Sequence, residues 1–94
     1  PLFVDFTAEW CGACKKMAKE TFADVDVMKR CGSFVAVKID ATNDEDPQVK
    51  AMMEKYKVVG LPTVVVYDSE GKERKRFNDF VGAQDFLSAL EGIN

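Results

Sequence analysis

Apolar residues gather into three short runs that are typical of buried strands. The first is Leu2–Thr7, the second is Phe34–Ile39, and the third, Thr63–Tyr67, is dense in β-branched residues. The segment Glu73–Val81 is more polar and carries several charges, which predicts a strand at or near the edge of a sheet. The pattern therefore predicts four strands, of which the last is the most exposed to solvent.

Helical segments separate these strands. Good helix formers run from Cys11 to about Ala23, and Asp24 is a suitable N-cap for a second short helix that ends at Gly32. A third helix follows the polar turn Thr42–Pro47, and apolar residues from Phe86 onward mark a last one. Four residues at helical spacing give the third helix one apolar face: Val49, Met52, Met53 and Tyr56.

The predicted order is β-α-β-α-β-β-α, an α/β fold with a central mixed four-stranded sheet flanked by helices. The first half forms a parallel βαβ unit, and the second half forms a hairpin around Asp68–Gly71 followed by a helix. A chain of 94 residues suffices for one domain, which we assign to residues 1–94. Because the chain opens at Pro1 inside an apolar run, we expect this domain to be excised from a longer protein.

The composition of the chain excludes several classes of function. The net charge of −3 argues against nucleic-acid binding, which needs a basic face, and no apolar run approaches the ~20 residues that span a bilayer. The chain has no histidine, so His-based acid–base catalysis and His-containing metal sites are excluded. It has three cysteines, and an odd number in so short a chain is not a structural disulfide framework.

Two of these cysteines form the sequence Cys11-Gly12-Ala13-Cys14 where a strand gives way to a helix. The first turn of a helix favours an anion, so Cys11 is the expected nucleophilic thiolate. Cys14, which we expect to be more buried and less reactive, is close enough to resolve a mixed disulfide with a substrate and leave Cys11 and Cys14 oxidised. This chemistry needs no metal and no cofactor beyond the cysteine pair itself.

Two other interpretations of the pair remain open at this stage. It could be half of a zinc site, although Cys31 is the only further thiol available and zinc normally takes four ligands. It could also be a coincidental pair of buried cysteines without redox function.

The segment Val4–Lys15 resembles the active-site segment of thioredoxins, and Val59–Thr63 resembles their cis-proline loop. Val81 and Gly82 resemble the residues after the last strand of that family. The likeness covers essentially the whole chain and implies a thioredoxin fold. The extra N-terminal strand and helix of full-length thioredoxins have no counterpart in this sequence.

The chain is still more similar to the C-terminal periplasmic domains of the DsbD family of thiol:disulfide interchange proteins. The features that carry this likeness are Glu20-Thr21-Phe22, Asp24, Thr42-Asn43-Asp44 and Gly60-Leu61-Pro62-Thr63. The resemblance implies a monomeric periplasmic domain that exchanges electrons with partner proteins through a transient mixed disulfide. It also implies a membrane-embedded domain as electron donor.

The resemblance also assigns roles around the cysteines. Pro62 should be cis and lie against the pair, where the backbone of Leu61 can pair with an extended substrate segment. The alternative is a proline that merely starts the following strand. Trp10 should shape the substrate-contact surface together with Gly12 and Ala13.

Asp5 interrupts an apolar strand and occupies the place of the buried carboxylate that thioredoxins keep beneath the pair. Burial would raise its pKa, which suits a proton acceptor for Cys14. Its side chain could instead reach solvent at a strand end. Lys38 matches a lysine that pairs with this carboxylate, and a solvated lysine is an equally valid interpretation.

Three positions depart from the patterns of these families. Thioredoxins have proline where Ala13 stands, and the DsbD domains often have an acidic residue where Ala18 stands. Cys31 matches no catalytic position and is expected to be a partly buried bystander.

The favoured function is a protein-disulfide reductase or electron-relay domain. The alternatives are a stand-alone cytoplasmic thioredoxin recycled by a flavin reductase and a non-enzymatic thioredoxin-fold binding module.

Overall fold

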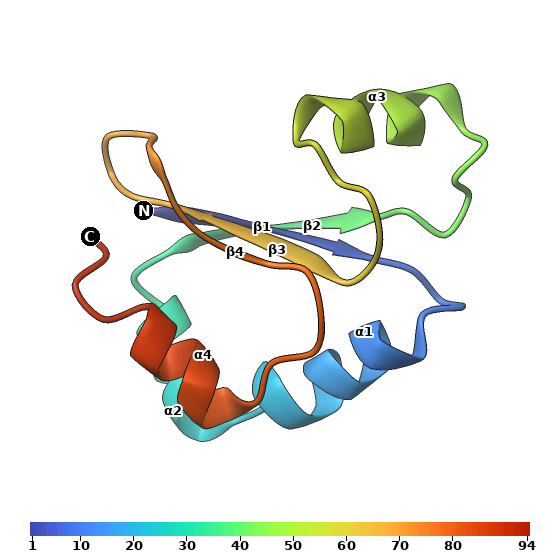
Figure 1. The fold of residues 1–94 in the computed structure, drawn as a ribbon. Helices are drawn as coiled ribbons and strands as arrows, with labels where there is room; N and C mark the ends of the chain where they lie inside the picture. Colours follow the sequence, from blue (N-terminus) through green and yellow to red (C-terminus); the bar gives the residue numbers. More distant parts are fainter.

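The computed structural model describes all 94 residues and has a four-stranded mixed sheet at its centre (Figure 1). The strands are β1 (Leu2–Thr7), β2 (Val35–Asp40), β3 (Thr63–Tyr67) and β4 (Glu73–Phe77), in the spatial order β2-β1-β3-β4. Strand β1 pairs parallel with β2 and antiparallel with β3, and β3 pairs antiparallel with β4. The predicted fold class and the predicted element order are both confirmed.

Helices cover both faces of the sheet. Figure 1 shows α3 (Pro47–Lys55) alone on one face, whereas α1 (Gly12–Lys16), α2 (Val25–Cys31) and α4 (Ala83–Ala89) lie on the other. The π-helical turn η1 (Met17–Thr21) joins α1 to the segment before α2. No helix combines the length and the apolar character that crossing a membrane requires.

Two apolar clusters hold these layers together. The larger one lies between the sheet and the helical segments η1, α2 and α4, and it is rich in aromatic rings. The smaller one packs Val4, Phe6 and Val58 against half-buried side chains at the end of α3. Three of the four residues predicted for the apolar face of that helix take part, Met52, Met53 and Tyr56, whereas Val49 does not. The larger cluster consists of Phe3, Met17, Val27, Phe34, Val64, Val66, Phe86, Leu90 and Ile93.

Both edges of the sheet differ in detail from the sequence prediction. Strand β2 begins and ends one residue later than expected and is an exposed edge strand, with Val35 65% and Val37 40% accessible to solvent. Strand β4 is the other edge, as predicted, but it ends at Phe77 rather than Val81. The last residues leave the sheet because Phe80 and Val81 turn toward the larger apolar cluster.

The helix expected from Cys11 to Ala23 is present but not uniform. It is α-helical only as far as Lys16 and then widens into η1, where the N–H of Phe22 donates to the carbonyl oxygen of Met17 at 2.9 Å. The extra residue in this turn directs the fully buried Thr21 inward, and its hydroxyl donates to the carbonyl oxygen of Val81. The turn therefore anchors the end of the cysteine-bearing helix to the loop before α4.

A C-terminal motif of α3 sets the direction of the loop that approaches the cysteines. Lys57 takes the left-handed conformation at φ 56°, and the N–H groups of Lys57 and Val58 donate to the carbonyl oxygens of Glu54 and Met53. Val58 and Met53 also meet in the smaller apolar cluster, which completes a Schellman motif. The chain leaves α3 in a fixed direction and enters the loop that ends at Pro62.

Candidate active site

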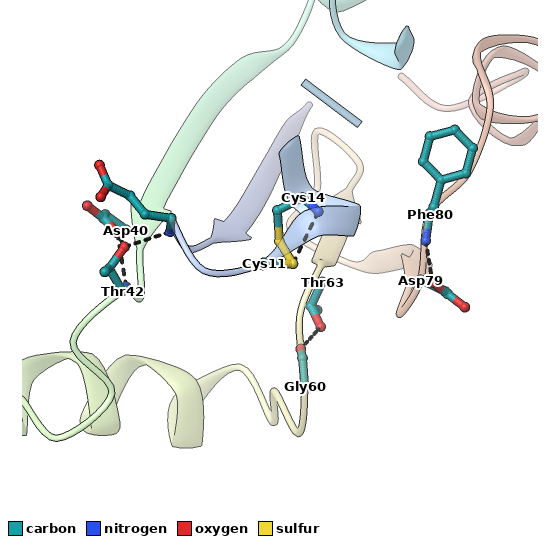
Figure 2. Close-up of a disulfide and its surroundings, with 9 residues drawn as sticks. Cys11, Cys14, Asp40, Thr42, Gly60, Thr63, Asp79 and Phe80 are labelled. Atoms are coloured by element: carbon teal, nitrogen blue, oxygen red, sulfur yellow. Dashed lines mark hydrogen bonds between the residues drawn. A yellow bond between two sulfur atoms is a disulfide. The ribbon is translucent and has the colours of Figure 1, made fainter. Parts of the chain in front are cut away.

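The sulfur atoms of Cys11 and Cys14 form a disulfide, with Cα atoms 5.2 Å apart (Figure 2). Cys11 is the N-cap of α1, and its Sγ accepts a hydrogen bond from the backbone N–H of Cys14 at 3.1 Å. This contact places a positively polarised N–H group against the sulfur that we expect to become a thiolate. Both cysteines are buried in the disulfide form, Cys11 at 6% exposure and Cys14 at 5%, so the two differ little in accessibility.

The loop before β3 closes over the pair. Leu61 packs against the small cluster formed by Ala8 and the two cysteines, and the Leu61–Pro62 peptide bond is cis, as the resemblance implied. Figure 2 shows the disulfide beside the start of β3, where the Thr63 hydroxyl donates to the carbonyl oxygen of Gly60 at 2.7 Å. Gly60 is exposed and Leu61, which contacts the cysteine pair, is half-buried, so this loop is partly accessible to solvent.

Asp5 lies in the middle of β1, between Lys38 of β2 and Val64 of β3. It is partly buried, and burial raises the pKa of its carboxyl group from 3.8 to about 6, although the charge of Lys38 acts in the opposite direction. Asp5 and Cys14 line the same cavity of about 270 Å³, together with Ala18 and Lys38. Asp5 and Cys14 therefore border the same space.

Lys38 is exposed and forms no ion pair within 4.0 Å, so it acts on Asp5 through its charge rather than through direct contact. It also lines a second cavity of about 250 Å³ beside Cys14, which Glu9, Lys15 and Asp40 border as well. The larger cavity of about 430 Å³ lies at the start of β1 and does not involve the cysteines.

Trp10 precedes the pair and is 60% exposed, and its indole N–H donates to the carbonyl oxygen of Thr42 at 2.8 Å. From the sequence, Thr42 was placed in a polar turn and in the likeness to DsbD domains, and Asp40 was not singled out at all. The available signal was their position, because β1 and β2 are parallel and their carboxyl ends meet where the cysteine motif begins. Val59 was also missed as an individual residue, and at 95% exposure it adds apolar surface beside the cis-proline loop.

The other positions singled out from the sequence lie as follows. Gly12 is exposed, and a Cβ atom there would meet nothing within 4 Å, while Ala13 is half-buried against the disulfide cluster. Cys31 is half-buried against the larger apolar cluster, and burial raises the pKa of its thiol. A bystander role for Cys31 agrees with this placement, since it lies in a different cluster from the pair.

Comparison with known proteins places this geometry in a family. A family model described as a thioredoxin-like domain matches residues 1–94, the whole chain. The chain belongs to the thioredoxin-like domain family.

Relatives of this thioredoxin-like domain narrow the assignment. The structure of the DsbD C-terminal domain of Neisseria meningitidis in its oxidised form superimposes with a TM-score of 0.82 at 30% identity, covering 100% of this chain and 80% of that one. The thiol:disulfide interchange protein DsbD of Photorhabdus laumondii is 40% identical over 94 residues, and that of Campylobacter jejuni is 33% identical over 91. The matches cover 98% and 97% of this chain but only 16% of each relative. This domain is thus similar to DsbD C-terminal domains, as the sequence motifs indicated.

The raised pKa of Asp5 predicts a pH dependence of stability in this thioredoxin-like domain. The folded state binds this proton more tightly than the unfolded state, so the contribution of Asp5 to stability is greatest below pH 3.8 and is lost as the pH rises through about 6. Asp5→Asn stays neutral and is expected to be about 2 kcal/mol more stable than wild type at pH 7.5, with no difference near pH 3.5. Urea unfolding of the oxidised proteins at both pH values measures this, with the exposed Asp44→Asn as the matched control. A gain that is equal at both pH values would show that Asp5 titrates normally.

Proposed function

We propose that this domain is a protein-disulfide reductase that relays electrons to oxidised partner proteins. The observation that supports it is the placement of the Cys11–Cys14 disulfide between a helix N-terminus and the partly accessible cis-proline loop. A thiolate at Cys11 is stabilised there, and an extended partner segment can reach it by pairing with the Leu61 backbone. The names of the relatives, which are thiol:disulfide interchange proteins, agree with this chemistry.

The reaction proceeds in two exchanges. In the reduced domain, the Cys11 thiolate attacks one sulfur of the partner's disulfide, forms a mixed disulfide and releases the other partner sulfur as a thiolate. Asp5 then accepts the proton of the Cys14 thiol, and the resulting thiolate attacks the Cys11 sulfur. The second partner thiolate leaves, so the partner gains two electrons and the Cys11–Cys14 pair loses them.

The pair must be reduced again before the next cycle. We propose that a dithiol on a membrane-embedded donor domain attacks the Cys11–Cys14 disulfide and becomes oxidised in turn. The domain then works in the periplasm, as the likeness to DsbD C-terminal domains favours. Neither exchange needs a metal or an organic cofactor, because the electrons move with the sulfur–sulfur bonds.

The reduction potential of the pair tests the direction of electron flow. We expect a value near that of thioredoxin, about −270 mV, because a reductase must hold its electrons less tightly than its partners do. Equilibration in dithiothreitol buffers measures it, with the single tryptophan, Trp10, as fluorescent reporter beside the pair. A potential near about −120 mV, which is typical of strong oxidants, would overturn the reductase assignment while leaving the cysteine chemistry intact.

A further inference from the structure

The turn after β2 holds the segment that leads into the cysteine motif. The backbone N–H of Glu9 donates to the Thr42 hydroxyl oxygen at 2.9 Å, and the indole N–H of Trp10 donates to the Thr42 carbonyl oxygen at 2.8 Å. These contacts join residues that are 33 and 32 positions apart in the sequence. A single residue, Thr42, therefore holds both the backbone and the side chain of the segment immediately before Cys11.

Thr42 is held in turn by the carboxylate of Asp40. One oxygen of that carboxylate accepts hydrogen bonds from both the backbone N–H of Thr42, at 3.0 Å, and its hydroxyl group, as Figure 2 shows. Because the hydroxyl proton points to Asp40, the hydroxyl lone pairs are free to accept from Glu9. The same hydrogen bonds keep the pKa of Asp40 below its usual value, so the carboxylate is ionised and a strong acceptor at neutral pH.

The side chain of Trp10 is fixed and yet exposed. Its N–H group is satisfied by Thr42, whereas 60% of the residue is accessible to solvent. A large aromatic ring that is already ordered loses little conformational entropy when a partner covers it, and this raises affinity without new contacts. Trp10 is also the residue immediately before Cys11, so a polypeptide that approaches the Cys11 sulfur should meet its ring.

We propose that Asp40 and Thr42 are positioning residues that hold Trp10 as a preordered docking surface for the polypeptide of the partner disulfide. The proposal rests on the reductase function argued above and adds residues that act through Trp10 rather than on the sulfur atoms. Partner recognition should therefore depend on Asp40 and Thr42, whereas the intrinsic reactivity of the Cys11–Cys14 pair should not.

The test compares a protein substrate with a small one. Thr42→Val removes the hydroxyl while keeping the shape, and we expect it to raise the KM for a model protein disulfide such as insulin about fivefold, with kcat within about twofold of wild type. Reduction of the small disulfide 5,5′-dithiobis(2-nitrobenzoic acid) should be unchanged. The fluorescence anisotropy of Trp10 should fall, because the ring gains freedom. Thr42→Ser keeps the hydroxyl and should restore all these values.

Two further variants make the outcome decisive. Asp40→Ala removes the acceptor that orients Thr42 and should show the effects expected of Thr42→Val, even if the Thr42→Val variant does not fold. Asp44→Ala is the matched control, because the Asp44 carboxylate lies two residues beyond Thr42, is exposed and makes no hydrogen bond or ion pair. Its KM should stay at the wild-type value.

The failures of the two proposals are distinguishable. A wild-type domain that reduces the small disulfide but not insulin would contradict the proposed reductase function. A wild-type domain that reduces insulin, together with Thr42→Val and Asp40→Ala variants whose KM and Trp10 anisotropy are unchanged, would overturn the positioning role alone. A loss of rate that is equal for both disulfides would also overturn it, since the residues would then act on the cysteines.

Discussion

Replacement of Cys11 by serine is expected to lower the rate of disulfide reduction at least about 10³-fold, to the background level. A serine hydroxyl stays protonated at neutral pH, and its oxygen cannot form the mixed disulfide through which the electrons pass. The hydrogen bond from the Cys14 N–H to the Cys11 sulfur supports the thiolate, but it cannot make an alcohol react with a disulfide. Insulin reduction with dithiothreitol as the electron source measures the loss.

The third cysteine provides the matched control for this variant. Cys31 lies against the larger apolar cluster, and burial raises its pKa, so it is a poor nucleophile at neutral pH. Cys31→Ser should therefore keep the wild-type rate, and far-UV circular dichroism should show that both variants are folded. Wild-type activity in Cys11→Ser would refute the assignment of the nucleophile, whereas loss of activity in Cys31→Ser would mean that the third thiol takes part.

Replacement of Cys14 by serine should trap the mixed disulfide, which Cys11→Ser cannot form. The first exchange still occurs in this variant, but the second cannot. Cys11 attacks the partner and stays joined to it, so a covalent complex should accumulate in most of the protein when equimolar oxidised partner is added. Turnover with a protein substrate should fall at least about 10²-fold, since release then depends on an external thiol. Electrophoresis without reducing agent shows the complex. Added dithiothreitol should reduce the intermolecular disulfide and separate the two proteins.

If Cys11 attacks first, only the Cys14→Ser variant should accumulate the covalent complex. Because the cysteines are almost equally buried in the disulfide form, accessibility alone does not say which one attacks first. The N-cap position and the donated N–H group favour Cys11. If Cys11→Ser rather than Cys14→Ser accumulated the covalent complex, the roles of the two cysteines would have to be exchanged.

The fold was predictable from the sequence where local rules decide the structure. Asp24 and Asp46 cap α2 and α3 through bonds to backbone N–H groups two and three residues ahead, which a sequence pattern can indicate. The cysteine motif and Pro62 were likewise recognisable as short segments. The carboxyl group of Asp5 could be placed because it interrupts an apolar strand, and its raised pKa is a result of that position.

Features that depend on contacts between distant residues were not predictable. The hydrogen bond from Thr21 to Val81 joins residues 60 positions apart, and it accompanies the change from α-helix to π-helix. The contact between Trp10 and Thr42 requires knowledge of which strands are neighbours. The early end of β4 depends on Phe80 packing against a cluster whose residues come from both halves of the chain. In each case tertiary packing overrides a local preference.

The π-helical turn has a consequence for how this chain can change length. Each residue added to a helix rotates the residues beyond it by about 100°, so one insertion or deletion between Cys14 and Thr21 would turn one end of the segment relative to the other. The sulfur pair at the front must face the cis-proline loop, while the threonine at the back must reach Val81. The number of residues between Cys14 and Thr21 is therefore constrained, independently of which residues they are. Substitutions can accumulate at the exposed positions between the two ends, whereas the gain or loss of a single residue would displace one end.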